Sequence, residues 1–164
     1  MKFHILAVAL LILVPTFAQA DILPNTNKFK SDPRNVEGEN WEGPHVPEIM
    51  TEGDWKKVIA KSKEAPVFVF KHSTECPVSA GAAYRTNTFI SKEATKDTPN
   101  FYFVKVIERK PVSKTIEAST KVKHESPQLL LLKDGKVLWN TSHEKITADS
   151  IKKAVAQNVE VGLD

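Results

Sequence analysis

The sequence contains a single cysteine, Cys76, and the residues around it suit thiol chemistry. An apolar run at 67–70 precedes it and predicts a buried strand, while residues 80–85 after it predict a helix. Pro77 fits the first turn of that helix, where its missing N–H is not needed. We therefore expect Cys76 at a helix N-terminus, where unpaired amides and the helix dipole favour a thiolate. A purely structural, buried thiol is the alternative for a lone cysteine, and this strand–Cys-Pro–helix setting argues against it.

Ser79 lies three residues after Cys76, where a C-x-x-C dithiol motif has its second cysteine. Without a second thiol, a mixed disulfide on Cys76 must wait for a thiol from outside. Ser79 is expected to hydrogen-bond the thiolate but cannot resolve the disulfide. His72 either stabilises the thiolate or is a solvated loop residue. His124 and His143 lack the spacing of metal-ligand pairs, so we predict no metal site and no cofactor.

The elements that must position these residues follow from apolar periodicity and turn signals. A first helix is predicted over Glu48–Glu64, with Thr51 as N-cap and Asp54 completing the capping box. Strands are predicted at 66–70, 101–107, 128–132 and 137–139, with a hairpin turn at 134–135. Helices are predicted at 76–92, from 111 or 112 to about 121, and after 147. The order β-α-β-α-β-β-α, after an extra N-terminal helix, predicts an α/β thioredoxin-like fold with a central mixed sheet.

This fold places Cys76 at the C-terminal edge of a central strand, where open α/β sheets have their sites. Ser126-Pro127 precedes the third predicted strand. In thioredoxin-like proteins the proline at this place is cis and faces the active cysteine, so we predict a cis peptide bond here although most X-Pro bonds are trans. Its role would be to expose the backbone of Ser126 for pairing with an extended substrate.

The N-terminal part has a different composition from the rest of the chain. Residues 1–20 have the basic start, apolar stretch and Ala18-Gln19-Ala20 site of a signal peptide, with cleavage expected before Asp21. Residues 21–47 are polar and proline-rich and predict an extended arm, and residues 48–164 form the predicted domain. We expect an exported protein, periplasmic or extracellular, that is monomeric and has no membrane span. The net charge of +3 without a basic stripe gives no indication of nucleic-acid binding.

Four blocks of the sequence resemble the YtxJ family of monothiol bacilliredoxin-like proteins: Lys71-His72-Ser73-Thr74-Glu75-Cys76-Pro77-Val78-Ser79, Val106–Ser113, Val122-Lys123-His124-Glu125-Ser126-Pro127-Gln128, and Ser142-His143 before Ile146-Thr147. The resemblance covers about Trp55 to Val155. It implies a thioredoxin fold, a nucleophilic Cys76, and removal of a low-molecular-weight thiol, bacillithiol in this family, from S-thiolated client proteins.

We thus expect two groups of site residues. The expected catalytic residues are Cys76, Pro77, Ser79 and Pro127. The expected substrate-binding residues are His72, His124 and Ser126. An alternative function is a thioredoxin-fold binding module that captures a partner without redox turnover, because the resolving cysteine is missing and the arm carries Trp41. A third possibility, a glutaredoxin-like iron–sulfur carrier, also uses one cysteine, but no feature of the sequence favours it.

Overall fold

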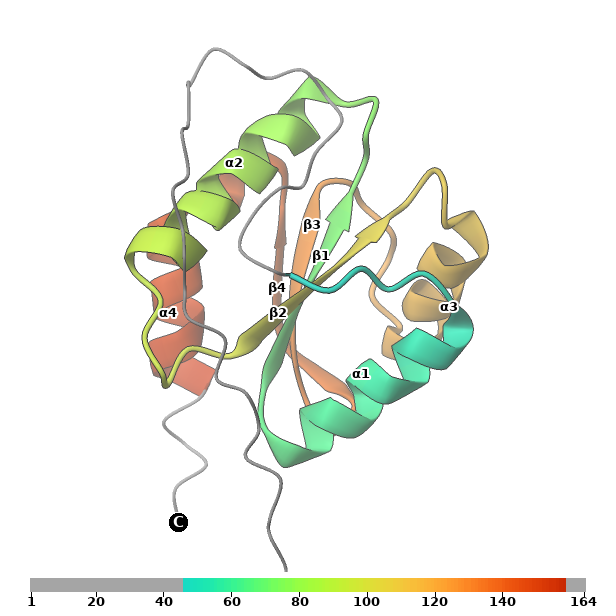
Figure 1. Ribbon diagram of the computed structural model, residues 1–164, viewed down its shortest axis with the longest axis horizontal. Helices are drawn as coiled ribbons and strands as arrows, with labels where there is room; N and C mark the ends of the chain where they lie inside the picture. The colour runs from blue at the N-terminus through green and yellow to red at the C-terminus, as the bar shows by residue number, and fades with distance from the viewer. Residues whose placement is uncertain (1–45, 159–164) are drawn as a thin grey trace, which may run out of the picture.

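A four-stranded mixed sheet with helices on both faces forms the folded part of the protein (Figure 1). The computed structural model describes residues 46–158. The expected signal peptide, the arm up to residue 45 with Trp41, and the last residues from 159 lie outside the described residues. None of the helices within 46–158 is long and apolar enough to cross a membrane.

The sheet has the strand order β2-β1-β3-β4. β1 (Val67–His72) pairs in parallel with β2 (Asn100–Lys105) and antiparallel with β3 (Gln128–Lys133), which continues through a hairpin into β4 (Lys136–Ser142). Asp134 and Gly135 have positive φ angles of 53° and 72°, so the predicted hairpin turn is confirmed. The first strand runs two residues beyond its predicted end, because Lys71 and His72 still pair with β2.

The first helix begins later than predicted. α1 spans Glu52–Glu64, because residues 47–49 bond to the edge of β2 instead. The Ile49 N–H donates to the Phe103 carbonyl at 2.7 Å, and the Phe103 N–H donates to the Pro47 carbonyl at 3.1 Å. A sheet edge satisfies these backbone groups as a helix would have done.

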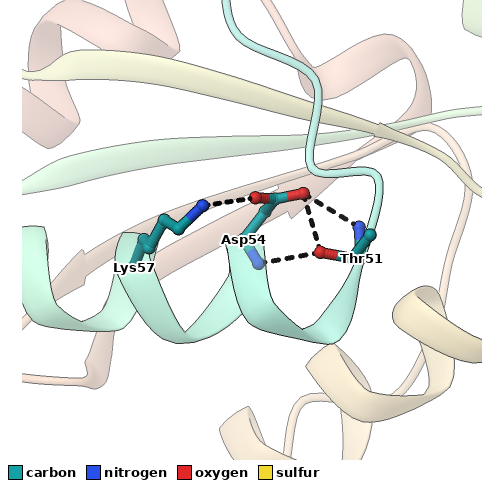
Figure 2. Close-up of polar contacts among 3 residues, drawn as sticks. All are labelled: Thr51, Asp54 and Lys57. Carbon is teal, nitrogen blue, oxygen red and sulfur yellow. Dashed lines mark hydrogen bonds and ion pairs between the residues drawn. The ribbon is translucent and has the colours of Figure 1, made fainter.

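The predicted cap of α1 is present in full (Figure 2). The Asp54 N–H donates to Thr51 Oγ1 and the Thr51 N–H donates to Asp54 Oδ2, each at 3.1 Å. Lys57 Nζ adds an ion pair with Asp54 Oδ1 at 3.0 Å. The two residues therefore satisfy one another's backbone donors at the start of the helix.

The remaining helices complete two apolar layers. α2 (Pro77–Lys92) and α4 (Ala148–Asn158) cover one face of the sheet, while α1 and α3 (Lys110–Thr120) cover the other (Figure 1). Because side chains alternate along a strand, Phe68 and Phe70 of β1 face α2 and α4, whereas Val67 and Val69 face α1 and α3. A short 3₁₀ helix, η1 (His143–Lys145), precedes α4 and was not predicted. The mixed sheet with two helices on each face has the element order predicted for a thioredoxin-like α/β fold.

Candidate active site

Cys76 lies where the chain passes from β1 into α2. It is the N-cap residue of α2, in extended conformation, and its thiol-bearing side chain is partly exposed. Pro77 is the first helical residue, and the Ala80 N–H donates to the Cys76 carbonyl at 3.0 Å to close the first turn. The predicted position of Cys76 at a helix N-terminus is therefore confirmed, and the dipole of α2 points its positive end at this residue.

Ser79 is fully buried in the first turn of α2, and its oxygen faces the end of β1. Its Oγ accepts the Ser73 N–H at 2.9 Å and lies 2.9 Å from His72 Nδ1. Sequence reasoning expected this hydroxyl to bond the Cys76 thiolate. The structure instead assigns it to His72 and to the turn that leads to Cys76.

His72 is the last residue of β1 and only 6% exposed, so the prediction of a solvated loop residue is wrong. Burial lowers its pKa to about 4, although the nearby Glu108 opposes this shift. The imidazole is neutral at pH 7, and it therefore supplies no positive charge to a thiolate. Its contact with Ser79 gives it a different part in the site.

The Ser126–Pro127 peptide bond is cis, as predicted. Pro127 directly precedes Gln128, which pairs with Lys71 of β1, so the proline lies at the sheet edge where β1 ends. The Pro127 carbonyl accepts the His143 N–H at 3.0 Å. Among the described residues, nothing hydrogen-bonds the buried Ser126 Oγ.

The loop that carries Pro127 is braced by residues that were not among the expected site residues. The Ser142 hydroxyl donates to Glu125 Oε2, and His143 Nδ1 lies 3.7 Å from the same carboxylate oxygen. Arg85 of α2 donates from Nε to the Ile146 carbonyl at 2.8 Å. No local pattern marks this set, because its members come from α2, the 121–127 loop and the end of β4.

His124 lies on the α3 side of this edge. The backbone N–H of His124 donates to Glu117 Oε1 at 2.9 Å, and the ring Nδ1 of His124 is 3.5 Å from Ser113 Oγ. Burial, followed by the nearby Lys71, lowers the pKa of this imidazole. His124 therefore contacts residues of α3, whereas His72 contacts Ser79 of α2. The substrate-binding role of His124 stays a prediction.

Lys71 is a further buried residue near the site that was not among the expected site residues. Its side chain is 1% exposed, and burial lowers its pKa to about 8, with Glu117 opposing the shift. By strand alternation it points to the α1 and α3 face, opposite to His72. A lysine directly after four apolar strand residues was the signal available in the sequence.

Two exposed apolar residues lie in segments that follow β1 and β2. Val78 beside Cys76 is 38% exposed, and Ile107 after β2 is 43% exposed. The Thr74 hydroxyl donates to Glu108 Oε1 at 2.8 Å, which ties the turn before Cys76 to the segment after β2. Exposed apolar groups beside a nucleophile suit contact with a protein surface. Within residues 46–158, no three His, Cys, Asp or Glu side chains are grouped to hold a metal ion.

Comparison with known proteins gives a family and a fold. The family described as "Monothiol bacilliredoxin BrxC" matches residues 47–151. A solved thioredoxin-fold protein proposed to be an oxidoreductase is 32% identical, with a TM-score of 0.59 over 66% of this chain and 92% of that chain. Thioredoxin NaTrxh from Nicotiana alata is 19% identical, with a TM-score of 0.58 over 74% of this chain and 98% of that chain. Fasciola hepatica thioredoxin is 15% identical, with a TM-score of 0.54 over 68% and 98% of the two chains. The last two similarities bear on the fold alone.

Proposed function

The chain belongs to the monothiol bacilliredoxin family and is a thiol–disulfide oxidoreductase, and we propose that it removes a low-molecular-weight thiol from S-thiolated client proteins. The observation that carries this proposal is the position of Cys76. It is a partly exposed thiol at the N-terminus of α2, with a fully buried serine, and no second cysteine, at the resolving position.

The proposed reaction is one thiol–disulfide exchange. The Cys76 thiolate attacks the small-thiol sulfur of the client's mixed disulfide, a new S–S bond forms on Cys76, and the client sulfur leaves as a thiolate that takes a proton from water. A second small thiol from solution then attacks the Cys76 disulfide, which releases Cys76 and a disulfide of two small thiols. The client is reduced, and the external thiol is the reductant.

Other expected residues support this step in different ways. The chain presents Cys76 at the N-terminus of α2, directly before Pro77. The backbone of Ser126 is the part that would pair with an extended client segment. Val78, an exposed apolar residue two positions after Cys76, suits a protein client rather than a free small molecule.

We further propose that this chemistry takes place outside the cytoplasm, in a periplasm or extracellular space. The support is the signal-peptide pattern in residues 1–20. The intact mass of the protein recovered from its native compartment tests this, since a mass that begins at Asp21 is expected. A mass that retains residues 1–20 contradicts export by this route.

The exchange reaction is tested with a model protein that carries one S-thiolated cysteine. On mixing with the reduced protein, intact mass spectrometry should show the small thiol move to Cys76 and leave the model protein. The Cys76→Ser variant is the matched control and should show no transfer. A disulfide-linked adduct of the two proteins without small-thiol transfer contradicts the proposal and supports the alternative of a capture module.

A further inference from the structure

A buried chain of hydrogen bonds leads from β1 to the nucleophile. It starts at His72, whose Nδ1 lies 2.9 Å from Ser79 Oγ. The same oxygen accepts the Ser73 N–H at 2.9 Å, and the Ser73 carbonyl accepts the Cys76 N–H at 3.4 Å. His72 and Ser79 come from different elements and are both more than nine-tenths buried. The Ser79 hydroxyl thus binds the turn that carries Cys76 through the Ser73 amide.

The proton positions in this chain follow from burial. Ser79 Oγ already accepts the Ser73 N–H, so the hydroxyl proton of Ser79 needs an acceptor of its own. Within the described part of the chain, His72 Nδ1 is the acceptor placed in reach of that oxygen. The imidazole must then be neutral and carry its proton on Nε2. Burial of His72 keeps it in this form near pH 7.

The two charged groups near His72 act in opposite directions on its protonation. Glu108, in the segment after β2, favours the imidazolium, while Lys105 at the end of β2 disfavours it. From α2 the imidazole faces the neutral hydroxyl of Ser79, and within β1 it faces the Phe70 ring at a centroid distance of 6.0 Å. Desolvation is the largest influence, and it acts in favour of the neutral ring.

We propose that His72 is a positioning residue for Cys76. Its neutral imidazole orients the Ser79 hydroxyl, and the Ser79 oxygen in turn holds the Ser73 amide and the 73–76 turn that presents the thiol at the start of α2. Ser79 is therefore a holding group for the turn rather than a donor to the thiolate. The role of this contact in catalysis rests on the proposed function. The positioning of Cys76 itself can be tested without any client or small thiol.

The test measures the rate at which iodoacetamide alkylates Cys76 at pH 7, which needs no client and no small thiol. His72→Leu removes the acceptor for the Ser79 proton, and we expect alkylation about tenfold slower, the effect of losing one buried hydrogen bond. His72→Asn keeps an acceptor oxygen near the position of Nδ1, so its rate should stay within about threefold of the original protein. Thr86→Val, which removes another buried hydroxyl of α2 that bonds Ala82, is the matched control and should leave the rate unchanged.

A double variant separates positioning through Ser79 from a general loss of structure. Ser79→Ala should slow alkylation as His72→Leu does, and His72→Leu should add no further loss in the Ser79→Ala background. Urea unfolding of each variant shows whether it is folded at the assay temperature, and His72→Asn and Ser79→Ala keep the test valid if His72→Leu is not. Multiplying effects in the double variant, or an unchanged rate in folded His72→Leu, would overturn the inference.

The two proposals fail in different ways. If alkylation follows this pattern while no small thiol is transferred from the model client, the positioning inference holds and the proposed function is wrong. If transfer occurs but the alkylation rate ignores His72 and Ser79, the function holds and the inference is wrong.

Discussion

Lys71 and His72 are neighbours at the end of β1, yet their side chains enter opposite layers of the molecule. His72 has a hydrogen-bond partner in α2, Ser79. Lys71 faces the layer under α3, where Glu117 interacts with it electrostatically. Both side chains are removed from water, and in both cases burial disfavours the charged form. The last two residues of β1 are therefore two buried ionisable side chains at the end of the strand that leads to Cys76.

The Lys71→Met variant should be more stable than the original protein at pH 7. Methionine fills a similar volume without a charge to desolvate, whereas Lys71 has a pKa of about 8 in the fold against an ordinary value of 10.5. The free energy of unfolding should rise by up to about 3 kcal/mol, the equivalent of that shift in pKa. Urea denaturation followed by tryptophan fluorescence measures the difference.

The exposed Lys56 of α1 provides the control for this change. Lys56→Met should alter the free energy of unfolding by no more than about 0.5 kcal/mol, as surface substitutions usually do. If Lys71→Met were destabilising instead, the ammonium of Lys71 would have to make a favourable interaction that outweighs its desolvation.

At the scale of elements, α1 shows how local sequence determines a helix start. Thr51→Ala removes the hydroxyl that accepts the Asp54 N–H, and the reciprocal bond to the Thr51 backbone loses its support (Figure 2). We expect a loss of about 1 kcal/mol in the free energy of unfolding. Equilibrium urea denaturation measures it.

Lys57→Ala is the matched change on the same carboxylate. Its ion pair with Asp54 is exposed to solvent, so removing it should cost only a few tenths of a kcal/mol. Equal losses in the Thr51 and Lys57 variants would contradict the view that the capping box, rather than the charge pair, stabilises this end of α1.

For the whole molecule, the two buried groups predict a stability that increases with pH in two separate ranges. Between about pH 6.5 and 4 the unfolded chain binds more protons than the folded one at His72, so stability falls as the solution is acidified. Between about pH 8 and 10.5 the same is true at Lys71, so stability rises as the solution is made more alkaline. Each range contributes up to about 3 kcal/mol.

Variants that do not titrate at these positions assign each range. His72→Asn should flatten the plot of unfolding free energy against pH below 6.5, and Lys71→Met should flatten it above 8. Urea midpoints across the pH range provide the measurement. A full acid-side slope in His72→Asn would mean that carboxylates with lowered pKa values, such as Asp54 and Glu108, dominate there instead.

Local patterns in the sequence were sufficient for much of this architecture. The apolar run before Cys76, Pro77 after it, the Thr51–Asp54 box and the Asp134–Gly135 turn each depend on residues close together in the chain, and all four are present as predicted. The cis bond at Pro127 was predicted only through the fold, and family similarity supports that fold.

Only the tertiary structure decided which residues of the site contact one another. The pairing of residues 47–49 with β2, the burial of His72, its partner Ser79, and the bracing of the Pro127 loop by η1 all join segments far apart in sequence. Which layer Lys71 and His72 enter depends on sheet register, because a shift of one residue exchanges the two faces. The sequence by itself thus predicted Cys76 as the nucleophile, and it predicted the position of Cys76 at a helix start, which the structure confirms. The packed sheet decided that the serine three residues later is bonded to a buried, neutral histidine.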